Sequence, residues 1–152
     1  MSDNPDHNDA ELVLKLYELR REPELRKARD WWLTKFWPGN ADEFIKIAGA
    51  LGTPENAYIR QVGSYWGMAA SFANRGILDM ELFQLPAVSG EMFFFFAKVF
   101  PFVQEIREKM GDPTLFSEIE KAINSTEWGR ERLQFVVLRV ATLREKMAGK
   151  PA

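Results

Sequence analysis

The sequence predicts an all-α fold: a compact bundle of six to eight helices around a phenylalanine-rich central helix. Apolar residues recur at helical spacing along most of the chain, capping patterns and prolines divide it into segments, and no segment alternates apolar and polar residues as a half-buried strand would. With 152 residues and 46% hydrophobic content, the chain is long enough for one core. We expect a flexible N-terminal tail over residues 1–8, a single helical domain over 9–148 and a frayed C-terminus over 149–152.

Local signals place the helices of the first half of the chain. Asn8 with Glu11 is a capping-box pattern, so the first helix is expected to begin there. Thr53 is expected to cap the fourth helix, which carries Gly63 and Gly67 on one face. Because glycine inside a helix costs about 1 kcal/mol relative to alanine, this face predicts either close packing or a groove.

The central helix is expected over residues 91–110. Four consecutive phenylalanines, residues 93–96, point in directions about 100° apart, which requires a central position to enclose them. Pro101 predicts a kink within this helix. The apolar passage from Met92 to Val103 is shorter than the roughly 20 residues that cross a bilayer, so we interpret it as a core helix.

The composition excludes several classes of function. The chain has no cysteine and one histidine, which excludes a disulfide framework, a thiolate metal site and a three-histidine centre, so we expect no metal and no cofactor. Its 20 basic and 22 acidic residues nearly balance, so no nucleic-acid partner is expected. The acidic N-terminus lacks the apolar segment of a secretory signal, which predicts a cytoplasmic protein.

One candidate site involves polar and aromatic residues of the fourth and central helices. Glu91 directly precedes the apolar run, and it is either a charge at the helix N-terminus or a buried partner of Arg60 or Arg75. In the second case it would line a pocket between helices 54–75 and 87–110. The predicted lining residues are Tyr65, Trp66, Glu91, Phe94, Arg60 and Arg75.

Surplus aromatic residues suggest a second kind of site. Trp31 and Trp32 are adjacent, so both cannot face the same core, and Trp37 follows shortly after them. Packing against neighbouring helices is one explanation. A protein interface that includes Trp31, Trp32 and Trp37 is the other.

Three segments carry a resemblance to a known kind of family. They are YWGMAA at residues 65–70, NRGILDMELF at residues 74–83 and FPFVQEIR at residues 100–107. Over residues 58–107 the chain resembles an uncharacterised family of all-helical bacterial domains. The resemblance implies a small helical domain of unknown function and supplies no catalytic residues. Members of such families often follow membrane segments, whereas we find none in this chain and expect no membrane insertion.

Together these observations favour a non-catalytic helical protein, although an enzyme that uses carboxylates and arginines stays open. The first hypothesis is an interaction module that binds a protein partner or a second copy of itself, as in a homodimer. The alternative is a binder of a small apolar or amphipathic ligand in the pocket described above.

Overall fold

The computed structural model describes residues 4–148, and all regular structure in that range is helical. The helices are α1 (His7–Leu19), α2 (Pro23–Thr34), α3 (Ala41–Ala48), α4 (Pro54–Asn74), α5 (Met80–Phe83), α6 (Pro86–Val99), the 3₁₀ turn η1 (Phe100–Phe102), α7 (Val103–Met110), α8 (Ser117–Asn124) and α9 (Glu127–Ala148). Within this range α6, η1 and α7 form one run, Pro86–Met110, and counting it once gives eight helices. The predicted all-α bundle is confirmed.

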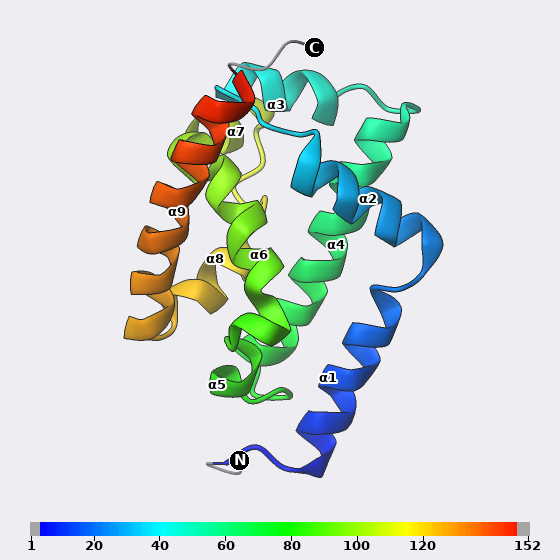
Figure 1. Ribbon diagram of the computed structural model, residues 1–152, viewed down its shortest axis with the longest axis vertical. Helices are drawn as coiled ribbons and strands as arrows, with labels where there is room; N and C mark the ends of the chain where they lie inside the picture. The colour runs from blue at the N-terminus through cyan, green and yellow to red at the C-terminus, as the bar shows by residue number, and fades with distance from the viewer. Residues whose placement is uncertain (1–3, 149–152) are drawn as a thin grey trace.

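The phenylalanine-rich helix α6 lies at the centre of the bundle (Figure 1). It packs against α9 on one side, and its side chains meet Val62 and Trp66 of α4 on another. Phe93, Phe95 and Phe96 are buried, whereas Phe94 is only partly buried. The central position is therefore confirmed, with three of the four rings fully enclosed.

One proline and one irregular residue interrupt the central run. Pro101 lies in η1, which separates α6 from α7 and confirms the predicted kink. The helix begins at Pro86, close to the bounds 87–110 given for the predicted pocket and earlier than a start at residue 91, and Ser89 has non-helical dihedral angles (φ −126°, ψ 18°). This irregularity marks a second bend, near Glu91.

The N-terminus of α1 differs from the sequence prediction. Asp6, not Asn8, is the N-cap: its carboxylate accepts hydrogen bonds from the backbone N–H groups of Asn8 and Asp9, and Asp9 reaches back to the N–H of Asp6. This reciprocal box starts the helix at His7, so residues 7 and 8, which were predicted as part of a flexible tail, are helical. The predicted fraying of residues 149–152 lies outside the described part of the chain.

The two glycines of α4 have different surroundings. A Cβ at Gly63 would lie 3.1 Å from the Phe116 ring, whereas nothing lies within 4 Å of one at Gly67. Their face lines a surface groove with the 112–118 segment, and α6 takes no part in it. The segment before α8 therefore packs closely at Gly63 and leaves a groove along Gly67, so the face shows both of the predicted features.

One run of the described chain, Pro86–Met110, is long and apolar enough to cross a membrane by length and composition. Half of its most apolar window is buried inside the bundle, as in the core helix of a folded domain.

Candidate functional site

A groove of about 310 Å³ lies between α1 and the parts of α4, α5 and α6 that face it. We call it the α1 groove. Its lining is aromatic and aliphatic apart from one charged side chain, that of Arg20. The lining residues are Val13, Leu14, Leu16, Tyr17 and Arg20 of the α1 segment, Tyr65 and Trp66 of α4, Phe83 of α5, and Ala87 and Val88 of α6.

Helix α1 forms one wall of the groove and is fastened at two points. The Asp9 carboxylate accepts a hydrogen bond of 2.9 Å from the backbone N–H of Asp79. One turn before the end of the helix, the Tyr65 hydroxyl donates to the carbonyl oxygen of Leu16. Burial raises the pKa of Tyr65 to about 12, so this hydroxyl is protonated at neutral pH and remains a donor.

A partly buried ion pair lies beside Arg20, the charged residue of the groove lining. Arg29 of α2 donates from Nε and Nη2 to the two carboxylate oxygens of Glu91, both at 2.8 Å, and from Nη1 to the carbonyl oxygen of Arg20 at 3.0 Å. The hydrogen bonds that Arg29 donates to Glu91 raise the pKa of Arg29. This two-point contact fixes the α1–α2 turn against α6.

Arg20 is the second cation of this cluster and has a different environment. Its side chain is only 10% exposed, and its Nη1 lies 3.7 Å from Glu91 Oε2. Its guanidinium makes no hydrogen bond to any described residue, and it lies 4.9 Å from the ring of Tyr17 and 5.5 Å from that of Trp66. The indole nitrogen of Trp66 is also buried without a hydrogen-bond partner in the described chain.

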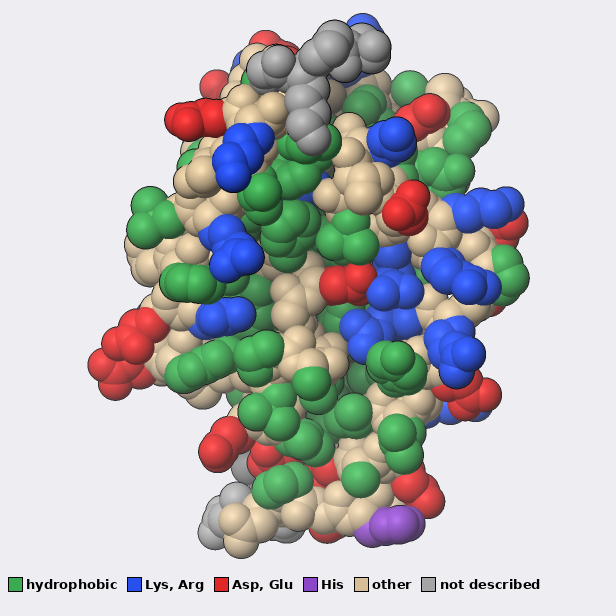
Figure 2. Space-filling model, in the orientation of Figure 1, with side chains coloured by type: hydrophobic (Ala, Val, Ile, Leu, Met, Phe, Trp, Pro, Cys, Tyr) green, Lys and Arg blue, Asp and Glu red, His purple; other side chains and the backbone are tan. Residues whose placement is uncertain are grey.

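The surface around the groove reflects this arrangement. Figure 2 shows Lys and Arg side chains gathered over the α1–α2 junction, with hydrophobic side chains below them between α1 and the start of α6. An apolar groove with a cationic end is suited to bind an amphipathic molecule.

The predicted site residues separate into two groups. Tyr65 and Trp66 line the α1 groove, and Glu91 lies at its end through contact with Arg20. Arg60 donates to Asn56 on its own helix, and Arg75 pairs with Glu118, so neither is the partner of Glu91. These two assignments are wrong, because the partners of Glu91 come from the α1 and α2 segments.

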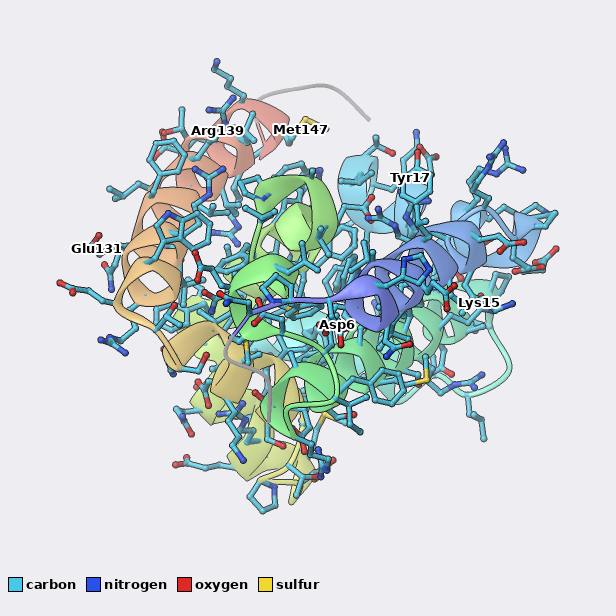
Figure 3. All side chains as sticks on the ribbon, turned by 90° about the horizontal axis from the view of Figure 1, so that it is seen from below. Asp6, Lys15, Tyr17, Glu131, Arg139 and Met147 are labelled. Atoms are coloured by element: carbon cyan, nitrogen blue, oxygen red, sulfur yellow. The ribbon has the colours of Figure 1, made fainter. Side chains whose placement is uncertain are left out.

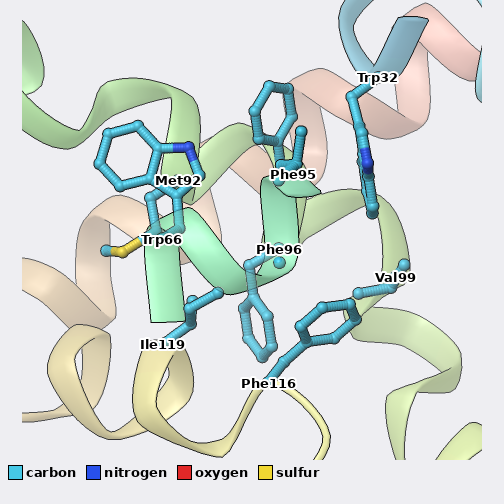
Figure 4. A pocket seen from close by; sticks show the side chains of 10 residues that line it. Trp32, Trp66, Met92, Phe95, Phe96, Val99, Phe116 and Ile119 are labelled. Atoms are coloured by element: carbon cyan, nitrogen blue, oxygen red, sulfur yellow. The ribbon is translucent and has the colours of Figure 1, made fainter. Parts of the chain in front are cut away.

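The space directly between α4 and α6 holds no ligand pocket. Trp66 and Val62 of α4 meet Met92, Phe95 and Phe96 of α6 there, and the remaining cavity is about 10 Å³ (Figure 4). These side chains, together with Ile119 of α8, fill the space between the two helices. Phe94 lies elsewhere, edge-on to the ring of Trp37.

The three tryptophans predicted as interface residues lie in or against the core. Trp32 is 1% exposed, and its indole N–H donates to the carbonyl oxygen of Tyr58, so its assignment to an interface is wrong. Trp31 stacks on Phe36 with ring centroids 4.4 Å apart, and it is partly buried. Trp37 is also partly buried, and its ring faces the ammonium of Lys98.

Lys98 is a buried cation outside the groove. Its ammonium donates to the carbonyl oxygens of Trp32 and Phe36 at the end of α2, and it lies 3.6 Å from the centroid of the Trp37 ring. Burial, with a smaller effect of Arg144, lowers the pKa of Lys98 to about 7. Its contacts are those of a helix C-terminal cap, so we assign it a structural role.

No group of three or more His, Cys, Asp or Glu side chains within residues 4–148 is arranged to hold a metal ion. The lining of the α1 groove offers apolar contact and one cation, Arg20.

The fold defines the class: an all-α helical bundle with an apolar groove under its first helix. Residues 5–128 match the family model described as "Domain of unknown function (DUF4760)", and the chain belongs to that family. The match includes every residue that lines the α1 groove, and it also includes Arg29. Most of α9 lies beyond the matched residues. Neither the curated proteins nor the solved structures gave a match.

Proposed function

We propose that the chain is a non-catalytic binding protein that holds a small amphipathic molecule in the α1 groove. The observation that carries this proposal is the lining of the groove, which is apolar and aromatic along its length and has one charged residue, Arg20, at its end. Its volume of about 310 Å³ lies at the lower end of the range of roughly 300–1,000 Å³ typical of small-molecule sites. The groove lies beside the predicted pocket and shares Tyr65 and Trp66 with it.

The test is isothermal titration calorimetry with octan-1-ol, a neutral amphiphile of suitable size. Wild-type protein is expected to bind one molecule per chain. Ala87 is exposed and lines the groove, so Ala87→Trp is expected to fill the groove and abolish binding without disturbing the core. Ala141→Trp, at an exposed position of α9, is the matched control and is expected to bind normally. The proposal fails if wild type shows no saturable binding or if Ala87→Trp binds equally well.

A second candidate function is self-association, and α9 supplies the observation that favours it. Trp128, Phe135 and Leu138 of this helix are 44%, 50% and 72% exposed. Phe135 and Leu138 lie on the side opposite its buried residues Leu133 and Val140, whereas the ring of Trp128 packs edge-on against Phe93 of α6. Figure 3 shows Glu131, on the same side of α9, pointing away from the bundle.

The charges beside this apolar face favour a second copy as its partner. Glu127 and Gln134 lie along one edge of the face, and Arg132 and Arg139 lie along the other. A two-fold axis parallel to α9 places Glu127 and the neutral Gln134 of one copy along the edge that faces Arg132 and Arg139 of the next.

Sedimentation equilibrium of wild type and Leu138→Glu tests this second function. The wild type is expected to dimerise and Leu138→Glu to be monomeric. Leu51→Glu, at a position that is 81% exposed in the α3–α4 turn, is the control and is expected to dimerise. A wild-type protein that is monomeric at every concentration excludes self-association.

A further inference from the structure

We infer that the molecule held in the α1 groove is an anion: a carboxylate on a short apolar chain, with the carboxylate at Arg20. This inference rests on the proposed function and names the chemical class of the ligand. The charge of the cluster, the Arg20 guanidinium without a hydrogen-bonded acceptor, and the length of the groove each support it.

The first argument is charge. The cluster at the end of the groove contains two cations, Arg20 and Arg29, and one anion, Glu91. Both oxygens of Glu91 accept hydrogen bonds from Arg29, so the carboxylate is already engaged. Because Arg20 is the one charged residue in the groove lining, a positive charge remains there without a hydrogen-bonded counter-charge.

The second argument is the Arg20 guanidinium, which has an incomplete set of partners. Its side chain is nine-tenths buried, makes no hydrogen bond within the described chain and has one ion-pair contact there, with Glu91 Oε2 at 3.7 Å. A guanidinium is a donor only, so the partner that it lacks is an acceptor. A carboxylate is the small group that supplies acceptors and negative charge together, and it fits the fork of a guanidinium.

The third argument is length. Val13 and Arg20 both line the groove and are two turns apart, which corresponds to about 10 Å along α1. Since a water molecule, similar in size to a methylene group, occupies roughly 30 Å³ in the liquid, the groove volume corresponds to about ten non-hydrogen atoms. Octanoate has this size and a carboxylate at one end.

The experiment compares headgroups on a constant chain. Octanoate, octan-1-ol and octylammonium are titrated into the wild-type protein at neutral pH by calorimetry. Octanoate is expected to bind about tenfold more tightly than octan-1-ol, because it forms charge-assisted hydrogen bonds with Arg20, and octylammonium is expected to bind most weakly. Octan-1-ol binding with no preference for octanoate overturns this inference and leaves the proposed function standing. Absence of binding by all three overturns both.

Variants then assign the preference to one side chain. Arg20→Gln is expected to bind octanoate and octan-1-ol equally, whereas Arg20→Lys keeps the charge and is expected to retain part of the preference. Arg21→Gln removes the neighbouring exposed arginine and is expected to retain all of it. A full octanoate preference in folded Arg20→Gln, or its loss in Arg21→Gln, contradicts the assignment. Circular dichroism confirms folding, and Arg20→Lys keeps the test decisive if Arg20→Gln does not fold.

Discussion

The hydroxyl of Tyr65 donates a hydrogen bond to the carbonyl oxygen of Leu16, and this bond joins α1 to α4 beside the groove. It is one of two fastening points of α1, the other being the contact between Asp9 and Asp79. A single hydroxyl group therefore helps to hold the helix that forms a wall of the proposed binding site.

Removing this hydroxyl is expected to loosen α1. Tyr65→Phe should lower the free energy of unfolding by about 1 kcal/mol and should speed amide hydrogen exchange in α1 more than in α6. Tyr58→Phe, on the same helix, removes a hydroxyl that has no hydrogen bond in the described structure, and it is the control. Equal exchange in the two variants would show that the Tyr65 bond does not hold α1.

The ion pair between Arg29 and Glu91 is expected to stabilise the fold more than an exposed pair does. Arg29→Gln should cost about 2–3 kcal/mol, because Glu91 is only 17% exposed and loses its bidentate partner. Arg75→Gln breaks a pair whose arginine is 58% exposed and should cost less than about 1 kcal/mol. Urea denaturation measures both values, and similar losses would argue against a special role for the Arg29 contact.

Lys98 is expected to make stability depend on pH. Its pKa is about 7 in the folded chain against an ordinary value of 10.5. Between these values the unfolded chain binds a proton that the folded chain does not, so the free energy of unfolding should rise with pH by about 1.4 kcal/mol per unit. Below pH 7 both states are protonated, and the contribution of Lys98 no longer changes with pH.

Lys98→Met isolates this contribution. From pH 7 to pH 9 the wild type should gain about 2 kcal/mol more stability than the variant, because only the wild type carries this lysine. Urea denaturation at the two pH values gives the difference. If both proteins show the same pH dependence, the pKa of Lys98 is not lowered by burial.

Two glycines are expected to respond oppositely to alanine. Gly67 lies within α4 with nothing within 4 Å of an added Cβ, so Gly67→Ala should stabilise the protein by about 0.5–1 kcal/mol. At Gly129 a Cβ would lie 2.1 Å from the carbonyl oxygen of Ile123, so Gly129→Ala should destabilise it by more than about 2 kcal/mol. Thermal denaturation shows the direction of each change, and shifts of the same sign would contradict the account.

The positions of the helices were largely predictable because their signals are local. Pro54 after Thr53 and the proline at 101 act on the backbone beside them, and four adjacent phenylalanines require a central helix. The start of α1 was missed because Asp6 and Asp9 form the same capping pattern two residues earlier than Asn8 and Glu11.

The candidate site was only partly predictable because its key contacts cross long stretches of sequence. Glu91 was identified from its place beside an apolar run, but its partner Arg29 is 62 residues away. Arg20 and Arg29 belong to a stretch of alternating charges that is typical of a solvated helix surface. The α1–α2 turn brings both against α6, and no local pattern specifies that turn.

The most direct test of a ligand site under α1 is a native mass spectrum of the protein with octanoate, recorded for the wild type and for Ala87→Trp. We predict one octanoate per wild-type chain and none on the filled variant, and the same spectrum counts the subunits. A wild-type chain without octanoate, or equal adducts on both proteins, would contradict the proposed binding site.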